Sequence, residues 1–221
     1  RKAIQHLEGG IVAQILVANG ELVEADQALL ILDSTRYLAE RDILQGRLYN
    51  QQAAVDRLQA ERDGLPEVAF RAQLVAASSL DDRAANAISN ERALFTARSA
   101  DRDAEEAVFA SKQKGMELVM GSKQTVEESL SLEVLDLRDL LAEGYVDKQR
   151  LRELERSRSQ ILGELADLEV SIEEVSLRVT QLRKRFKKEV VDELAATLEA
   201  LYDIEQQLAA ADDKVQRSTI R

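Results

Sequence analysis

Apolar residues follow two different patterns along the chain. Between residues 4 and 33 they fall in short runs, separated by Gly9-Gly10 and by Asn19-Gly20, a dipeptide typical of tight turns. Beyond this head, apolar residues recur at intervals of three, four and seven, which is the period of helices that pack along one face. We therefore expect a small β-structured head followed by a long helical body.

Three helices are expected in that body. The first spans about residues 34–63, because Gly64 and Pro66 together form a strong helix stop. The second spans about residues 84–143, and the third about residues 148–215. At a rise of 1.5 Å per residue, the third helix alone would be about 100 Å long, which no compact domain contains.

The segment between the first and second helices is expected to fold back. The first and second helices together are longer than the third, so residues 64–83 should fold back and three helices should overlap near the head. Ser79-Leu-Asp-Asp82 fits a capping motif at the start of the second helix.

The second helix is expected to pack unevenly along its length. The positions beside its main apolar line are polar in the first half of the helix and apolar in the second half, so the second half should pack more firmly. The later companions are Val119, Val126, Val134 and Leu141, and the main line is Ile88, Phe95, Arg102, Phe109, Met116, Lys123, Leu130 and Leu137.

The third helix carries a regular coiled-coil seam. Its apolar residues alternate in steps of four and three, which favours a left-handed supercoil. Three successive steps of four, from Phe186 to Leu198, form a stutter that locally unwinds the coil. The regular part of the seam runs through Ile161, Leu165, Leu168, Ile172, Val175, Val179, Leu182 and Phe186.

A sharp turn at about residues 143–148 is expected to join the second and third helices. Gly144 favours a chain reversal, and Asp147 is placed to cap the third helix. We therefore expect an antiparallel hairpin, in which Leu137 and Leu154 pack within one chain. The alternative is a generic coiled-coil scaffold that dimerises through continuous helices, in which these two leucines would lie far apart along the rod.

Composition and charge exclude several classes of protein. The 221 residues carry 30 Lys and Arg against 41 Asp and Glu, a net charge of −11, which argues against binding to nucleic acid or to anionic membranes. Cysteine is absent, which excludes disulfides and thiolate metal sites and suits a periplasmic protein. His6 is the only histidine, so neither a histidine metal site nor a Ser-His-Asp triad is expected. No catalytic, metal-binding or cofactor-binding residue is predicted, and we expect a protein that is not an enzyme.

No membrane-spanning segment is evident in the sequence. The longest clean apolar run, residues 28–32, is far shorter than the roughly 20 residues that cross a bilayer. The chain begins at Arg1 without a charged-then-apolar leader. We expect it to be an internal part of a longer protein, with any membrane anchor lying upstream.

The spacing of glycines and apolar residues in the head resembles the first half of a biotinyl- or lipoyl-type β-sandwich. The structural residues of that motif are Gly9, Gly10, Gly20 and Asp33. Such domains carry a modifiable lysine on the hairpin between their two halves, but Asp33-Ser-Thr-Arg36 stands there in this chain. A carrier role, as in a carboxylase or dehydrogenase, is therefore disfavoured, and mass spectrometry that found an unmodified chain would remove it.

Four segments resemble the HlyD-type membrane fusion proteins, which are periplasmic adaptors of type I secretion systems. Residues 5–12, with the sequence QHLEGGIV, match the opening motif of these proteins. Residues 140–151 resemble the tip of their helical hairpin, residues 186–194 their return helix, and residues 213–221 the return to their lipoyl domain. The most similar branch contains the adaptors of protease and lipase exporters.

The resemblance implies a fold and a set of partners. The fold would be mainly helical: a long antiparallel coiled-coil hairpin with a third overlapping helix, inserted in half of a lipoyl-type β-sandwich. Residues 1–33 would form the first half of that domain, residues 34–215 the hairpin, and residues 216–221 the start of the second half. The partners would be an inner-membrane ABC transporter, a TolC-type outer-membrane channel, further copies in a ring of typically six, and a secreted protein such as a protease or lipase. The protein would lie in the periplasm of a Gram-negative cell, anchored in the inner membrane, with no nucleic-acid partner.

The resemblance also selects the hairpin tip as the candidate partner-binding site. Related drug-efflux adaptors carry an arginine, a leucine and a serine there; the matching positions here are Asp136, Leu140 and Asp147, so only the leucine agrees. Tyr145 and Val146 form an apolar pair that is exposed unless a partner covers it; the alternative is that the pair only staples the turn. The candidate residues are Leu140, Glu143, Gly144, Tyr145, Val146, Asp147, Lys148, Arg150 and Leu151.

Two groups of basic residues have more than one interpretation. The run from Arg183 to Lys188 is either an anion- or lipid-binding patch or, as we expect, a solvated helix face that pairs with acidic residues of a neighbouring helix. Arg102, Lys123 and Arg158 lie on the helical seams, where they either set the register or extend from a loose seam into solvent.

Overall fold

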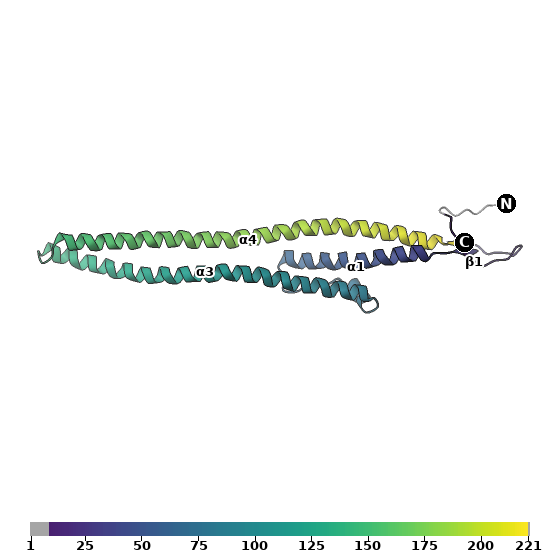
Figure 1. Ribbon diagram of the computed structural model, residues 1–221, viewed down its shortest axis with the longest axis horizontal. Helices are drawn as coiled ribbons and strands as arrows, with labels where there is room; N and C mark the ends of the chain where they lie inside the picture. Colours follow the sequence, from purple (N-terminus) through teal and green to yellow (C-terminus); the bar gives the residue numbers. More distant parts are fainter. Residues whose placement is uncertain (1–8, 221) are drawn as a thin grey trace. The chain divides into compact units, whose positions relative to one another are not determined.

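The computed structural model describes residues 9–220, so residues 5–8 of the opening motif, His6 among them, lie outside the described part. Contacts divide the chain into two compact units. The three-helix unit contains the residues up to Thr96 and those from Lys187 onward, and the hairpin unit is Ala97–Phe186. The described residues form three short strands and the helices α1 (Thr35–Asp63), α2 (Ala72–Ser78), α3 (Asp82–Ala142) and α4 (Lys148–Arg217). Figure 1 labels the three longer helices, α1, α3 and α4. The expected mainly helical class is confirmed.

The strands form one small antiparallel sheet in the three-helix unit. Strands β1 (Val12–Ile15), β2 (Leu30–Leu32) and β3 (Thr219–Ile220) lie in the order β1-β2-β3. The register of β1 and β2 shifts between Val12 and Gln14. Because β3 pairs with β2, segments from the two ends of the sequence meet in one sheet. A lipoyl-type sandwich needs a second sheet facing the first, and residues 9–220 do not form one.

Each residue assigned to the lipoyl motif has a conformation or a contact that explains why this residue type suits its position. Gly9 and Gly20 have φ angles of +69° and +85°, which residues with a Cβ rarely adopt. A Cβ on Gly10 would lie 3.1 Å from a methyl group of Leu32, so a larger residue would crowd the sheet. Asp33 accepts hydrogen bonds from the Thr35 hydroxyl and backbone N–H, at 2.6 and 2.9 Å. These bonds, the side-chain bond above all, lower the pKa of Asp33 and fix the start of α1.

The first helix ends where the sequence predicted. Gly64 adopts a left-handed conformation with φ +67°, and its N–H donates to the carbonyl of Glu61. The N–H of Leu65 donates to the carbonyl of Ala60 at 2.9 Å, which completes a Schellman motif. The chain can therefore leave the axis of α1 immediately and fold back along it.

The fold-back region packs against α1, as expected, but it contains a helix that the periodicity did not predict. Leu74 on α2 is buried together with Ala53 of α1 and with Ala84 and Ala87 of α3. Asp56 of α1 is buried and accepts hydrogen bonds from the backbone and the guanidinium of Arg71, which anchors the segment that precedes α2. Three helices thus overlap in this unit because small alanines on α1 and α3 let α2 approach closely.

The predicted cap of the second long helix was wrong. Asp81, not Ser79, caps α3, because its carboxylate accepts a hydrogen bond from the N–H of Arg83 at 2.9 Å. The hydroxyl of Ser79 instead donates to the carbonyl of Ala76 at 2.7 Å. Ser79 therefore closes α2, which the sequence pattern did not include.

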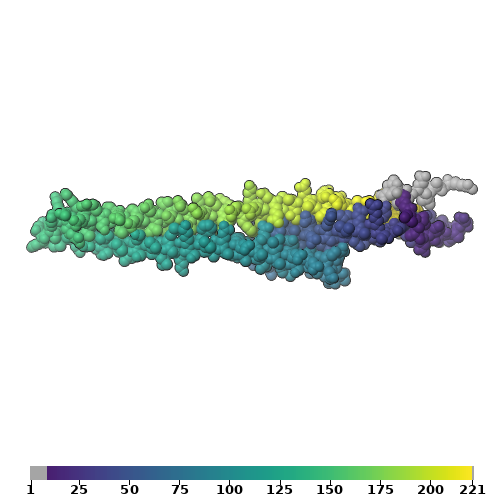
Figure 2. Space-filling model, viewed as in Figure 1, coloured from purple at the N-terminus to yellow at the C-terminus, as the bar shows by residue number. Residues whose placement is uncertain are grey.

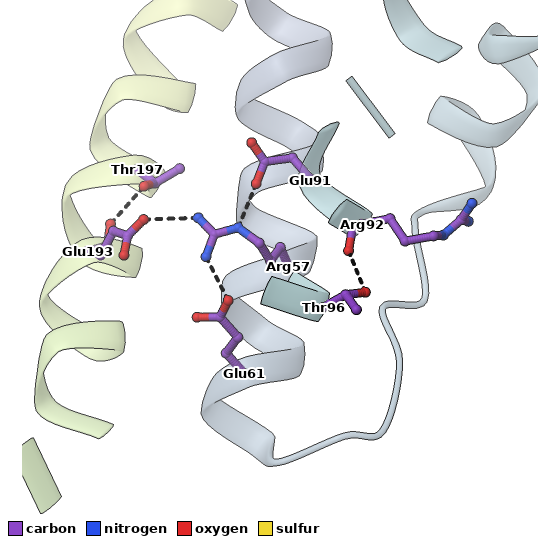
Figure 3. A network of polar contacts seen from close by, with 7 residues as sticks. All are labelled: Arg57, Glu61, Glu91, Arg92, Thr96, Glu193 and Thr197. Carbon is purple, nitrogen blue, oxygen red and sulfur yellow. Dashed lines mark hydrogen bonds and ion pairs between the residues drawn. The ribbon is translucent and has the colours of Figure 1, made fainter. Parts of the chain in front are cut away.

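A buried arginine joins three helices of this unit (Figure 3). The side chain of Arg57, on α1, is 3% exposed and donates from Nη1 to Glu61 at 2.8 Å. It also donates from Nε to Glu91 of α3 at 2.5 Å and from Nη2 to Glu193 of α4 at 2.9 Å. Burial acts to lower the pKa of Arg57, but the bonds to Glu91, Glu61 and Glu193 together raise it above its ordinary value. The guanidinium therefore stays charged and fixes how these helix segments align.

The hairpin unit consists of antiparallel segments of α3 and α4, whose side chains lie against each other in Figure 2. Val134, Leu151 and Leu154 are buried together there, and Leu137 is one of the partly buried residues packed against them. Leu137 and Leu154 therefore belong to one cluster within one chain. The antiparallel hairpin is confirmed, and the continuous parallel coil is contradicted.

The companion line of the second long helix was partly misassigned. Val119 and Val126 are 47% and 45% exposed, so they do not lie on the seam. Counted back in sevens from the buried Val134, the seam instead passes through Glu127 and Met120, which are half-buried. The strict seven-residue repeat decides the seam, because polar side chains can occupy it when α4 offers them partners.

Ion pairs between α3 and α4 supply those partners in the hairpin unit. Arg158 and Lys123 both pair across the seam, which favours the register interpretation for these two residues. Arg102 instead lies over the ring of Phe186, 5.5 Å from its centroid. Arg183 and Arg185 pair with acidic residues of α3, as expected for a solvated helix face. The interhelical pairs are Arg158–Glu127 (2.7 Å), Arg138–Glu155 (2.7 Å), Arg183–Glu106 (2.6 Å), Arg185–Glu105 (3.8 Å), Arg150–Glu133 (3.9 Å) and Lys123–Glu164.

The last step of the predicted stutter in α4 was also wrong. Leu198 is 43% exposed, whereas the neighbouring Thr197 is half-buried. The hydroxyl of Thr197 donates to the backbone carbonyl of Glu193 (Figure 3). Its hydrogen bond is therefore made within α4, and the side chain can lie in the seam without a polar partner on another helix. The steps of four from Phe186 to the buried Leu194 agree with the prediction, and a step of three follows them.

Candidate partner-binding site at the hairpin tip

The turn between α3 and α4 is an ordered Schellman motif. Gly144 has a φ of +82°, and its N–H donates to the carbonyl of Leu141 at 3.1 Å. The N–H of Tyr145 donates to the carbonyl of Leu140 at 2.9 Å. A glycine is favoured at this position because other residues pay a conformational cost for a positive φ. The last carbonyls of α3 are thus satisfied within the turn, and the chain reverses sharply.

The return helix starts at a side-chain cap. Asp147 accepts a hydrogen bond from the N–H of Gln149 at 3.2 Å, in agreement with the cap predicted from the sequence. Asp147 is itself exposed, as are Glu143 and Lys148. The turn is therefore held by its backbone and by one capping carboxylate, which leaves its other side chains available at the surface.

The apolar side chains of the tip differ in exposure. Tyr145 is 76% exposed and Leu140 is 41% exposed, while Val146 is half-buried. An exposed tyrosine on an ordered turn offers a large, rigid contact surface at a low entropic cost. These three residues therefore form the apolar part of the candidate site.

Leu151 does not belong to that surface. It is only 9% exposed and packs with Val134 and Leu154 in the core of the hairpin. The reason is its position on the seam of α4, three residues before Leu154. Its place among the candidate contact residues is corrected: it supports the turn from within.

The charged side chains near the tip are largely exposed. The guanidinium of Arg150 lies 3.9 Å from Glu133 on α3 and 3.8 Å from Glu153 on its own helix. Sequence reasoning missed Leu132 and Leu135, which are 64% and 54% exposed on α3. Their signal was present in the sequence, because both lie off the two seven-residue lines that form the seam.

Two further properties of the described residues bear on the tip. No set of three or more histidine and acidic side chains between residues 9 and 220 is arranged to hold a metal ion. Over the same range, no helix combines the length and the apolar character needed to cross a bilayer. The tip thus offers apolar and charged contact groups on a rigid turn.

A family model described as "AprE, long alpha-helical hairpin" matches residues 37–214. This chain belongs to that family. The match covers α1 from its first turn, the fold-back region, the hairpin and nearly all of α4. The long hairpin expected from the sequence is therefore confirmed by the family as well as by the structure.

Curated relatives have names that describe secretion. The chain is 28% identical over 99% of its length to "Type I secretion system membrane fusion protein PrsE" of Rhizobium meliloti, and covers 53% of that protein. It is 27% identical over its whole length to "Alkaline protease secretion protein AprE" of Pseudomonas aeruginosa, covering 54% of it. It is 33% identical over 75% of its length to "Proteases secretion protein PrtE" of Dickeya chrysanthemi, covering 38%. The chain thus spans about half the length of the first two relatives.

A solved structure agrees with this assignment. The soluble domain of LipC, titled a membrane fusion protein of a type I secretion system, matches with a TM-score of 0.70 at 26% identity. The match covers all of this chain and 88% of the LipC chain. The resemblance to type I secretion membrane fusion proteins is therefore confirmed. The printed names describe secretion proteins, which is consistent with the expectation of a protein that is not an enzyme.

Proposed function

We propose that the chain is the helical part of a periplasmic adaptor that links an inner-membrane ABC transporter to a TolC-type outer-membrane channel. In this role it would serve the export of a protein such as a protease or lipase, as a ring of copies, typically six. Membership in the AprE hairpin family supports the proposal, as do relatives named for protease secretion. The anchor in the inner membrane is part of the same proposal.

We further propose that the helices are an insertion in a lipoyl-type β domain, with residues 1–33 as part of its first half. The support is that β3, which follows α4, pairs with β2, which precedes α1. A helical excursion that leaves and rejoins one sheet is the expected form of an inserted hairpin. In this arrangement the sheet fixes both ends of the excursion in one place.

The observation that carries the docking role is the exposed tyrosine on the ordered turn. Tyr145 is 76% exposed, although its backbone is fixed by the hydrogen bond to Leu140. Tyrosine is enriched among the residues that dominate binding energy at protein interfaces. A rigid turn that presents Tyr145, Val146 and Leu140 fits a partner with apolar helix ends, such as the rim of a helical channel.

The proposal is tested by photocrosslinking in cells that export their cargo. A photoreactive amino acid replaces Tyr145 in the full-length parent protein, and a matched control replaces Tyr202, which is also exposed, at 66%, but lies in the three-helix unit. We expect a crosslink to the outer-membrane channel from position 145 and none from position 202. Active export with no channel crosslink from position 145, or with an equal one from position 202, would overturn the docking role.

A further inference from the structure

The two helices of the hairpin carry opposite charge next to the tip. Residues 127–143 of α3 and the turn contain six carboxylates and one arginine. Residues 148–162 of α4 contain five basic side chains and two glutamates. The asymmetry is local, because the chain as a whole carries a net charge of −11. One flank of the hairpin end is thus acidic and the other is basic.

Part of this charge has no ionic partner among the described residues, 9–220. Three pairs cross the seam here and involve Glu127, Glu133 and Arg138 of α3. Among residues 9–220, no ion pair within the protein involves the other exposed charges of the two outer faces. Arg156 makes only a hydrogen bond to the carbonyl of Arg152 in its own helix. These remaining charges are Glu128, Asp136 and Asp139 on α3, and Arg152 and Arg156 on α4.

Exposed leucines lie among the acidic residues. Glu128, Leu132, Leu135 and Asp139 follow one another in steps of four, three and four, so they share one face of α3. Leu132 and Leu135 are 64% and 54% exposed on that face. Arg152 and Arg156 are four residues apart, so they share a face of α4, and both positions lie off its seam. The acidic face of α3 therefore also has apolar surface. The α4 face carries Arg152 and Arg156 beside Glu153, whose carboxylate lies 3.8 Å from Arg150 of the same helix.

The two faces lie at the same level of the hairpin. Arg138 of α3 lies 2.7 Å from Glu155 of α4, which places the segment around residues 135–139 beside the segment around residues 152–156. A neighbouring copy that lies parallel and unshifted would therefore bring its basic face against the acidic face of the first copy. An antiparallel or shifted neighbour would lose this match.

We propose that a second copy of this chain binds the α3 face described above, and that it does so through Arg152 and Arg156 of its own α4 face. The inference rests on the proposed function, because it assigns the contact surfaces of the ring. Arginine stems pack on the exposed leucines while their guanidinium groups pair with Asp136 and Asp139. Copies with a net charge of −11 repel one another, so such complementary faces would select one orientation.

The predicted contact is heterologous, since two different faces meet. Each copy therefore keeps a free α3 face on one side and a free α4 face on the other, and the contact propagates until it closes into a ring or forms a filament. A two-fold dimer through a single face is excluded by this arrangement. The outer-membrane channel is the competing occupant of the leucine face, and the experiments below separate the two.

Disulfide trapping tests the contact directly in the full-length parent protein. The chain contains no cysteine, so introduced thiols have no competitors within it. Asp136→Cys and Arg152→Cys are made in separate proteins, which are mixed and oxidised. We expect a crosslinked dimer in the mixture and none from either variant alone. The control mixes Arg152→Cys with Asp101→Cys, which lies on α3 far along the helix from position 136 and should not crosslink.

Charge reversal gives a second, independent test. Asp136→Arg with Asp139→Arg, or Arg152→Glu with Arg156→Glu, should each weaken self-association of the full-length protein by about tenfold or more, which corresponds to about 1.4 kcal/mol. A mixture of the two variants, or all four changes in one chain, should restore association because opposite faces again meet. Asp101→Arg with Glu205→Arg changes the net charge as much as Asp136→Arg with Asp139→Arg does, and should leave association unchanged.

The outcomes separate this inference from the proposed function. Copies that fail to crosslink, while position 145 still reaches the channel, would overturn the inference and leave the adaptor role intact. Trapping of Asp136→Cys with itself would also overturn it, because that result indicates a two-fold contact. Trapping of positions 136 and 152, without any channel crosslink from position 145, would support the contact and refute the docking role of the tip.

Discussion

Removal of the buried guanidinium should destabilise the three-helix unit more than any other single charge change. Arg57→Met keeps a long, flexible apolar stem but leaves three carboxylates without the group that joins them. The side chains of Glu61, Glu91 and Glu193 are 3%, 20% and 40% exposed, so the penalty falls mainly on Glu61. Breaking a buried ionic group in this way costs about 3–5 kcal/mol.

The assay is urea unfolding followed by circular dichroism, with hydrogen exchange of α1 amides to locate the loss in this unit. Arg62→Met is the matched control: its pair with Asp63 is about half exposed on the same helix, so the free energy of unfolding should change by no more than about 0.5 kcal/mol. Arg57→Met combined with Glu61→Leu should recover much of the loss, because it removes the most buried charge.

The Glu61→Leu background gives a further check on the reasoning. The loss caused by Arg57→Met should be smaller in that background, because the most buried of the three carboxylates is then absent. A loss below about 1 kcal/mol at neutral pH would refute the argument, because it would mean that the cluster is solvated rather than buried. A full-sized loss in the Glu61→Leu background would point to packing, not charge, as its cause.

Three further predictions concern the hairpin unit. Gly144→Ala should lower the free energy of unfolding by about 1 kcal/mol through backbone strain alone, since no atom lies within 4 Å of the added Cβ; thermal unfolding measures it, and Gly144→Asn should cost less. Leu154→Ala should cost about 2–5 kcal/mol in urea unfolding, because it opens a cavity beside Val134; a cost below this range would mean that the tip core is loosely packed. The hydrogen bond from Arg183 lowers the pKa of Glu106 below its ordinary value of 4.5. The stabilisation that the Arg183–Glu106 pair contributes is therefore complete above that pH and is lost as the pH falls through the lowered pKa. Glu106→Gln should flatten the acid limb of the curve of unfolding free energy against pH; an unchanged limb would contradict the pairing.

The helices and their ends were accessible from the sequence where one local signal decided the structure. Gly64 and Gly144 are read correctly as reversal points because a positive φ depends on the residue itself and on few neighbours. Asp147 is likewise a local cap. The hairpin followed from these signals and from the regular seam of α4, so the candidate tip could be located before any contact was known.

The errors concern residues whose partners come from other parts of the chain. Glu127 takes a seam position that Val126 was expected to fill, because Arg158 on α4 compensates its charge. Arg57 was not singled out, although the spacing to Glu61 was visible, because its other two partners lie on α3 and α4. Side-chain identity cannot show such partners, since a charged residue on a helix is usually solvated.

The seven-residue repeat of the hairpin unit also allows its length to change in fixed steps. Its seam positions on α3 recur in strict sevens, and those on α4 alternate in steps of four and three over the same span. Adding one repeat to each helix at facing levels would move the turn outward by about 10 Å, at 1.5 Å per residue, without rotating any side chain out of the seam. Insertions of other sizes, or in one helix alone, would turn the apolar face toward water. The reach of the hairpin and the surface of its turn are thus separable traits: repeats in the middle would change the length while the turn and its exposed side chains stay the same.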